Sequence, residues 1–116
     1  MNTFNYKKLI VWQKSMDLTS QIYVLTEALP RSEEFTLKSQ LRRAAISVSS
    51  NIAEGSARTT EADKKRFYTI ARSSLIEIDS QLETCVRLKY FTDENCQNAN
   101  PLIEEIFRIT SKLISK

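Results

Sequence analysis

The chain has 116 residues and carries 17 Lys and Arg residues against 14 Asp and Glu residues, which gives it a net charge of +3. That length suits one domain, which we expect to span residues 1–116. With no His, one Gly and two Pro, the sequence excludes His-dependent catalytic triads, His-ligated metal sites and glycine-rich phosphate loops, and it argues against β-sandwiches and barrels with many tight turns.

The first predicted helix begins near Lys8 and ends at Leu29, because Pro30 stops it. The apolar residues of its main face recur every three or four positions: Val11, Leu18, Ile22, Leu25 and Leu29. A second apolar stripe runs beside that face: Trp12, Met16 and Tyr23. Two stripes are more than one face of a bundle requires, so the helix has apolar surface to spare.

The second predicted helix runs from about Glu33 to Ala57, with Ser32 as its N-cap. Its apolar face repeats at helical spacing: Leu37, Leu41, Ala44, Val48 and Ile52. Small residues are common on this helix, and they allow close packing against a neighbour. The single glycine, Gly55, is interpreted either as a C-terminal cap or as a point of close helix contact.

The third predicted helix is the longest, from about Glu61 to Lys89. Thr60 followed by Asp63 resembles a capping box with Asp in place of the usual Glu. A seam with alternating steps of three and four residues follows: Phe67, Ile70, Ser74, Ile78, Gln81, Cys85 and Leu88. A flanking apolar stripe accompanies it: Tyr68, Leu75 and Leu82.

The fourth predicted helix follows a turn at residues 90–92 and is capped by Thr92 or Asp93. Alternatively, its periodic part begins at Pro101 with Asn100 as the cap. Its apolar spacing is four, three, four: Leu102, Ile106, Ile109 and Leu113. Four amphipathic helices with short connections predict an all-α fold, an antiparallel up-down-up-down four-helix bundle.

Basic residues concentrate in the middle of the chain, where residues 31–72 hold nine bases and five acids. We predict that this cluster contacts the phosphates of RNA or DNA without reading bases: Lys38, Arg42, Arg43, Arg58, Lys64, Lys65, Arg66 and Arg72. One alternative is a solvated face balanced by acids, with Glu54 paired to Arg58 four residues later. In the other, Arg42 and Arg43 form salt bridges between helices or between subunits.

Aromatic residues cluster near the N-terminus. They either staple and cover the first helix or form a subunit contact. The predicted oligomer contacts are these together with one tyrosine further along the helix: Phe4, Tyr6, Trp12 and Tyr23.

Nothing in the sequence predicts catalysis. Ser47 and its neighbouring serines lack an activating base, and the helical carboxylates lack the His of a di-iron bundle, so we expect no catalytic residue, metal or cofactor. The chain has no apolar run long enough to cross a membrane and no apparent secretory signal. We therefore expect a cytoplasmic protein in which Cys85 and Cys96 are reduced thiols.

Three segments resemble the 23S rRNA intervening-sequence protein family, also called the four helix bundle protein family: Phe4–Lys14, Gln40–Gly55 and Phe67–Glu77. The resemblance implies a bacterial four-helix bundle that assembles as a ring-shaped homopentamer and has no established enzymatic activity. Family members are often encoded within intervening sequences of 23S rRNA genes, and a related accessory protein of diversity-generating retroelements binds nucleic acid. The family signature carries over to these positions: Arg42, Arg43, Asn51, Glu54 and Gly55.

The leading hypothesis from the sequence is a non-enzymatic, oligomeric bundle that binds RNA or DNA through its basic residues. The alternative is a structural or adaptor module that self-associates and binds a protein partner.

Overall fold

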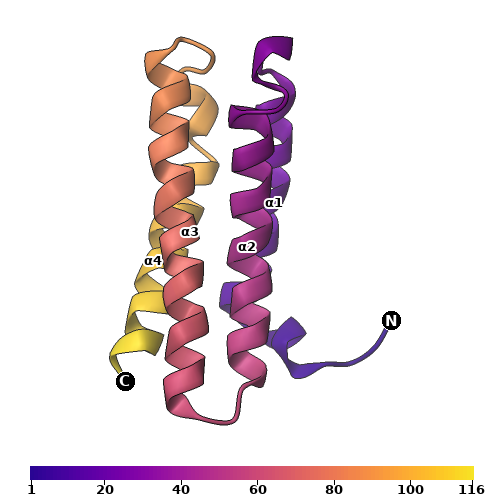
Figure 1. Cartoon of the computed structure of the whole chain (residues 1–116), viewed down its shortest axis with the longest axis vertical. Helices are drawn as coiled ribbons and strands as arrows, with labels where there is room; N and C mark the ends of the chain where they lie inside the picture. The colour runs from indigo at the N-terminus through magenta and orange to yellow at the C-terminus, as the bar shows by residue number, and fades with distance from the viewer.

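The computed structural model describes residues 1–116 and contains four α-helices and three short 3-10 helices, with no strand. The α-helices are α1 (Ile10–Glu27), α2 (Leu37–Ala57), α3 (Glu61–Arg87) and α4 (Ala99–Ser115). The 3-10 helices are η1 (Asn5–Lys8), η2 (Arg31–Glu33) and η3 (Glu94–Cys96). Successive α-helices run in opposite directions (Figure 1), which confirms the predicted all-α, up-down-up-down bundle.

One apolar core runs along the axis of the bundle, and α2 makes its most extensive contact with α3. The largest side chains with essentially no exposed surface come from all four helices: Leu18, Ile22, Leu41, Val48, Ile52, Leu75, Ile78 and Ile106. The predicted apolar faces of the first two helices account for most of the contribution of α1 and α2. None of the helices combines the length and hydrophobicity needed to cross a bilayer.

The seam predicted for the third helix is wrong at its ends. Ile70 and Leu88 are exposed, whereas Ala71 and Leu82 are buried. The observed buried seam of α3 is itself a heptad repeat: Tyr68, Ala71, Leu75, Ile78, Leu82 and Cys85. The predicted seam shares only Ile78 and Cys85 with this repeat, and the stripe predicted to flank it supplies three of the other four positions.

The structure also corrects the predicted start of the second helix. α2 begins at Leu37, and the preceding segment forms η2, so Ser32 is not its N-cap. Glu33 lies in η2, where its carboxylate accepts hydrogen bonds from the hydroxyl of Thr36 and, at 2.9 Å, from the phenol of Tyr90. One partner of this carboxylate is thus 57 positions away in the sequence.

The third helix begins where the sequence predicts, since the Thr60 hydroxyl accepts a hydrogen bond of 3.2 Å from the Asp63 amide. Its end and the start of the fourth helix differ from the prediction. α3 stops at Arg87, and residues 94–96 form η3 rather than α-helix. α4 starts at Ala99, so Asn100 is not a cap, and Pro101 lies in the first turn, where its missing N–H has no helical partner to lose.

Gly55 lies inside α2 with a helical backbone, so it is not a left-handed C-terminal cap. A Cβ atom placed on it would lie 2.8 Å from Cε1 of Tyr68 and 3.1 Å from Cβ of Phe67. Of the two interpretations offered by the sequence, the structure supports close helix contact: the glycine lets α3 approach α2.

Candidate nucleic-acid interface

The eight basic residues predicted to bind nucleic acid do not form one patch. Lys38, Arg42 and Arg43 lie on the first half of α2, whereas the others begin at Arg58, after its end. Twenty residues of helix separate Lys38 from Arg58, which corresponds to about 30 Å. In Figure 1 these two places are the opposite ends of α2.

Arg42 is held between α1 and α2. Its Nε donates a hydrogen bond of 2.9 Å to the hydroxyl of Thr26, and its Nη2 donates bonds of 2.7 Å to Glu27 and 3.3 Å to the main-chain oxygen of Tyr23. The guanidinium also lies 4.3 Å from the centroid of the Tyr23 ring. The hydrogen bond from Arg42, together with the nearby charges of Lys38 and Arg42, lowers the pKa of the Glu27 carboxyl. This geometry is the inter-helix pairing anticipated as an alternative to nucleic-acid contact.

The two neighbours of Arg42 in the predicted cluster differ from each other. The ammonium group of Lys38 lies 3.3 Å from Glu34 and 3.6 Å from Glu27, so its charge is shared by two carboxylates. Arg43 is exposed and makes no ion pair within the chain. It borders a groove that also contains Phe35, whose side chain is 90% exposed.

Two arginines flank one aromatic ring at the turn between α2 and α3. Arg58 lies 2.9 Å from the Glu54 carboxylate and 4.5 Å from the centroid of the Phe67 ring. Arg66 lies 3.8 Å from Asp63 and 5.1 Å from the same ring. Exposed ion pairs of this kind contribute little free energy, so a phosphate can compete with these carboxylates for either guanidinium.

The remaining three predicted bases have no carboxylate side chain within ion-pairing distance. Lys64 donates a hydrogen bond of 3.1 Å to the main-chain oxygen of Ser56. Lys65 donates to the main-chain oxygen of Lys116. Arg72 donates a bond of 3.2 Å to the Ser111 hydroxyl. The positive charges of Lys64 and Arg72 are therefore not neutralised within the chain, whereas Lys65 contacts the terminal residue.

The other signature positions serve the contact between α2 and α3. The Asn51 amide donates to the main-chain oxygen of Ser47 at 2.8 Å and to its hydroxyl at 3.1 Å. That hydroxyl shares a hydrogen bond of 2.8 Å with the hydroxyl of Ser74 on α3. Gly55 allows α3 to approach α2 closely, and Glu54 forms an ion pair with Arg58 at the end of α2. These three positions have structural roles in this chain.

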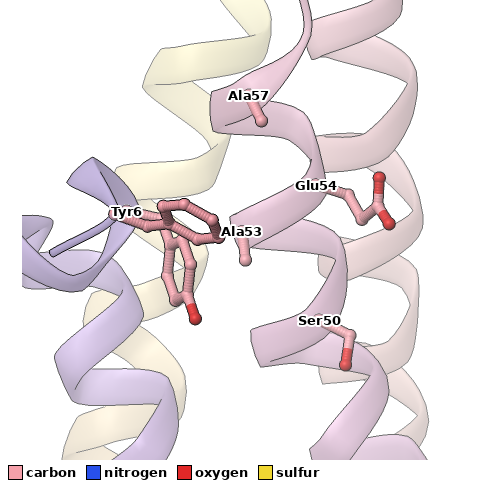
Figure 2. Close-up of a pocket in the computed structure, with 6 residues that line it drawn as sticks. Tyr6, Ser50, Ala53, Glu54 and Ala57 are labelled. Carbon is pink, nitrogen blue, oxygen red and sulfur yellow. The ribbon is translucent and has the colours of Figure 1, made fainter. Parts of the chain in front are cut away.

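The predicted oligomer contacts are partly used within the chain. Tyr6 meets Trp12 edge-on with 5.0 Å between ring centroids, as expected for aromatic residues that cover the start of α1. Figure 2 shows Ala53 on the side of α2 that faces Tyr6, whereas Glu54 points away from it. Beside them lies a groove of about 430 Å³, and Phe4 at its edge remains 63% exposed. Apolar surface for a partner is therefore left on this side of the bundle.

The two thiols are poor nucleophiles. Both Cys85 and Cys96 are buried and unpaired. Burial raises the pKa of the Cys85 thiol to about 11 and also raises that of Cys96. No group of three or more Cys, Asp or Glu side chains is placed to hold a metal ion.

Two basic residues on α4 were not predicted to belong to the site. Arg108 and Lys112 border a groove of about 500 Å³ that also includes Phe107 and Ser111. The ring of Phe107 lies 5.8 Å from the Arg72 guanidinium, so these residues continue the surface of α3. The signal was present, because residues 106–116 contain three bases and no acid, but averaging over the acidic residues before them concealed it.

A family model and a solved structure are both similar to this chain and agree with the resemblance seen in its motifs. Residues 7–112 match the model of a protein family described as 23S rRNA-intervening sequence protein. A solved structure of a protein of unknown function from the S23 ribosomal protein family of Bacteroides thetaiotaomicron is similar to this chain, with 27% sequence identity and a TM-score of 0.83. The similarity covers 92% of this chain and 100% of that one. No curated protein matches.

Proposed function

This chain belongs to the 23S rRNA-intervening sequence protein family, as its motifs indicated, and we propose that it is a non-enzymatic, oligomeric protein that binds RNA or DNA through phosphate contacts. The supporting observation is that Lys64 and Arg72 donate hydrogen bonds only to neutral oxygens. Hydrogen bonds between a charged donor and a phosphate are stronger than those to neutral acceptors. Phosphates can therefore replace the present partners of these side chains.

Binding of this kind releases counterions from the nucleic acid and reads no bases. The logarithm of the association constant then falls with the logarithm of salt concentration by about 0.7 per contact for single strands and about 0.9 for duplex DNA. Arg42 is not part of the proposed contact set, because its donors are engaged by α1. Arg43 is exposed and has no ion pair, but it lies near the other end of α2 from Lys64, Lys65 and Arg72.

Oligomerisation strengthens the field at any surface that the subunits share. We propose the homopentamer that the family resemblance implies, located in the cytoplasm. Its positive charge would be five times the +3 of one chain. Each ring would then present the same set of bases several times to one strand.

The test is the anisotropy of labelled RNA and DNA oligonucleotides titrated with the protein from about 50 to about 300 mM salt. We expect an association that weakens steeply as salt rises, with similar affinity for unrelated sequences. Absence of binding at the lowest salt concentration would reject the proposed function and leave a protein-binding role.

That second candidate, a self-associating module with a protein partner, is favoured by the outer face of α2. Ile46 and Phe35 are exposed near its beginning, and Phe4 lies beside its end. Light scattering at micromolar concentration separates the possibilities: a monomer would reject oligomerisation in both.

A further inference from the structure

Charge is segregated along the pair of helices α3 and α4. Residues 61–76 and 106–116 together contain seven bases and two acids, Glu61 and Asp63 in the first turn of α3. The intervening residues 77–105 contain seven acids and two bases. Because α3 and α4 are antiparallel and lie side by side (Figure 1), the two basic segments face each other at one end of the pair.

Two contacts fix this alignment. The Arg72 guanidinium bonds the Ser111 hydroxyl at 3.2 Å, and the Lys65 ammonium bonds the main-chain oxygen of Lys116. One half of the α3–α4 pair is therefore positively charged, whereas the other half is negatively charged. A polyanion is attracted to the first half and repelled by the second, which confines it to one end of the bundle.

An aromatic ring lies among the bases of the positive half. Phe107 is 40% exposed, and its ring centroid is 5.8 Å from the Arg72 guanidinium. Arg108 is 3.9 Å from its nearest carboxylate, and Lys112 has no ion pair. We call these five residues the basic α3–α4 face: Lys65, Arg72, Phe107, Arg108 and Lys112.

We propose that the basic α3–α4 face binds a single-stranded segment of RNA or DNA. Its four Lys and Arg side chains would contact successive phosphates, and Phe107 would stack against a nucleobase. This assignment rests on the proposed function and locates the nucleic-acid contact on the α3–α4 pair. Exposed aromatic rings beside a cationic track are the combination that single-strand binding requires, because every nucleobase offers a face for stacking. The nucleobases of a duplex are stacked inside it, so a duplex would contact only the basic side chains. An acidic protein segment would likewise contact those side chains without stacking on the Phe107 ring.

The test compares two triple variants that each remove three positive charges. K65Q/R72Q/K112Q changes the basic α3–α4 face, and R31Q/R87Q/K89Q changes exposed bases at the opposite end of the bundle. Anisotropy is measured with single strands of about 20 nucleotides as salt is varied. For the first variant we expect the slope of the log–log plot to fall by about 2, equivalent to roughly 100-fold weaker binding at about 0.1 M salt. The second variant should bind like the wild type, and far-UV circular dichroism checks the fold of both.

A second pair of variants tests the ring. F107A should weaken single-strand binding by about fivefold or more and leave duplex binding unchanged, whereas F35A, which removes another exposed ring, should change neither. Equal losses in the two triple variants would overturn the assigned location while leaving the proposed function intact. Wild-type protein that fails to bind any oligonucleotide would overturn both. Displacement of the strand by polyglutamate as readily as by unlabelled oligonucleotide would instead assign the face to an acidic protein partner.

Discussion

Replacing Arg42 by Ala separates a structural role of this residue from a binding role. The Arg42 side chain is 23% exposed and joins α2 to α1. Its bond to Thr26 is of a kind that contributes about 1 kcal/mol, and its contact with the Tyr23 ring about 0.5–1 kcal/mol. The partner Glu27 is largely exposed and adds little. Thr26 still donates to the main-chain oxygen of Ile22 after the change, so no buried group is left without a partner.

We therefore expect R42A to lower the free energy of unfolding by about 2 kcal/mol. R43A is the matched control: it removes the adjacent arginine of the same motif, which is exposed and unpaired, and should change stability by less than about 0.5 kcal/mol. Urea denaturation followed by circular dichroism measures both. In the anisotropy assay neither variant should change the salt dependence, because Arg42 is engaged by α1 and Arg43 lies on the first half of α2, away from the basic α3–α4 face. Equal stability of R42A and R43A would refute the structural role of Arg42 between α1 and α2.

Three further predictions follow from the core and the helix connections. G55A should be about 1 kcal/mol less stable in urea, because overpacking against α3 outweighs the helix propensity that Ala gains; a more stable variant would contradict the close contact. Hydrogen bonds from Thr36 and Tyr90 lower the pKa of Glu33 below its ordinary 4.5, so the stability it contributes is complete above that pH and lost as pH falls through the lowered value. Urea titrations across acidic pH should show the advantage of wild type over E33Q disappearing, and a constant difference would refute this role. A thiol reagent should label Cys85 only after denaturation, because the thiol is buried and its pKa is about 11; rapid labelling of the native protein would contradict that.

The sequence was most informative where interactions are local. Apolar spacing located all four helices, and the capping residues Thr60 and Asp63 set the start of α3 as predicted. The start of α2 was not found this way: Glu33 lies in η2 instead, and its carboxylate binds Tyr90, a contact between distant residues that local spacing does not reveal. Arg42 illustrates the same limit for a site. Its charge is visible in the sequence, but its partners belong to α1, and pairing across helices depends on register that apolar spacing alone does not specify.

The two candidate functions use different sides of the molecule. Phe4, Phe35 and Ile46, the residues that favour a protein partner, lie on α2 and on the segments beside its two ends, whereas the basic α3–α4 face lies on the other helix pair (Figure 1). Other exposed apolar side chains lie on α1 and α3, among them Val24 and Ile76. Self-association through α2 would leave the basic α3–α4 face of each subunit uncovered. An oligomer would then repeat one weak phosphate site several times, and a strand long enough to reach two sites binds the second as an intramolecular event. Under the two proposals, oligomerisation and nucleic-acid binding would therefore reinforce each other, because the assembly would repeat the modest charge of one chain along a strand.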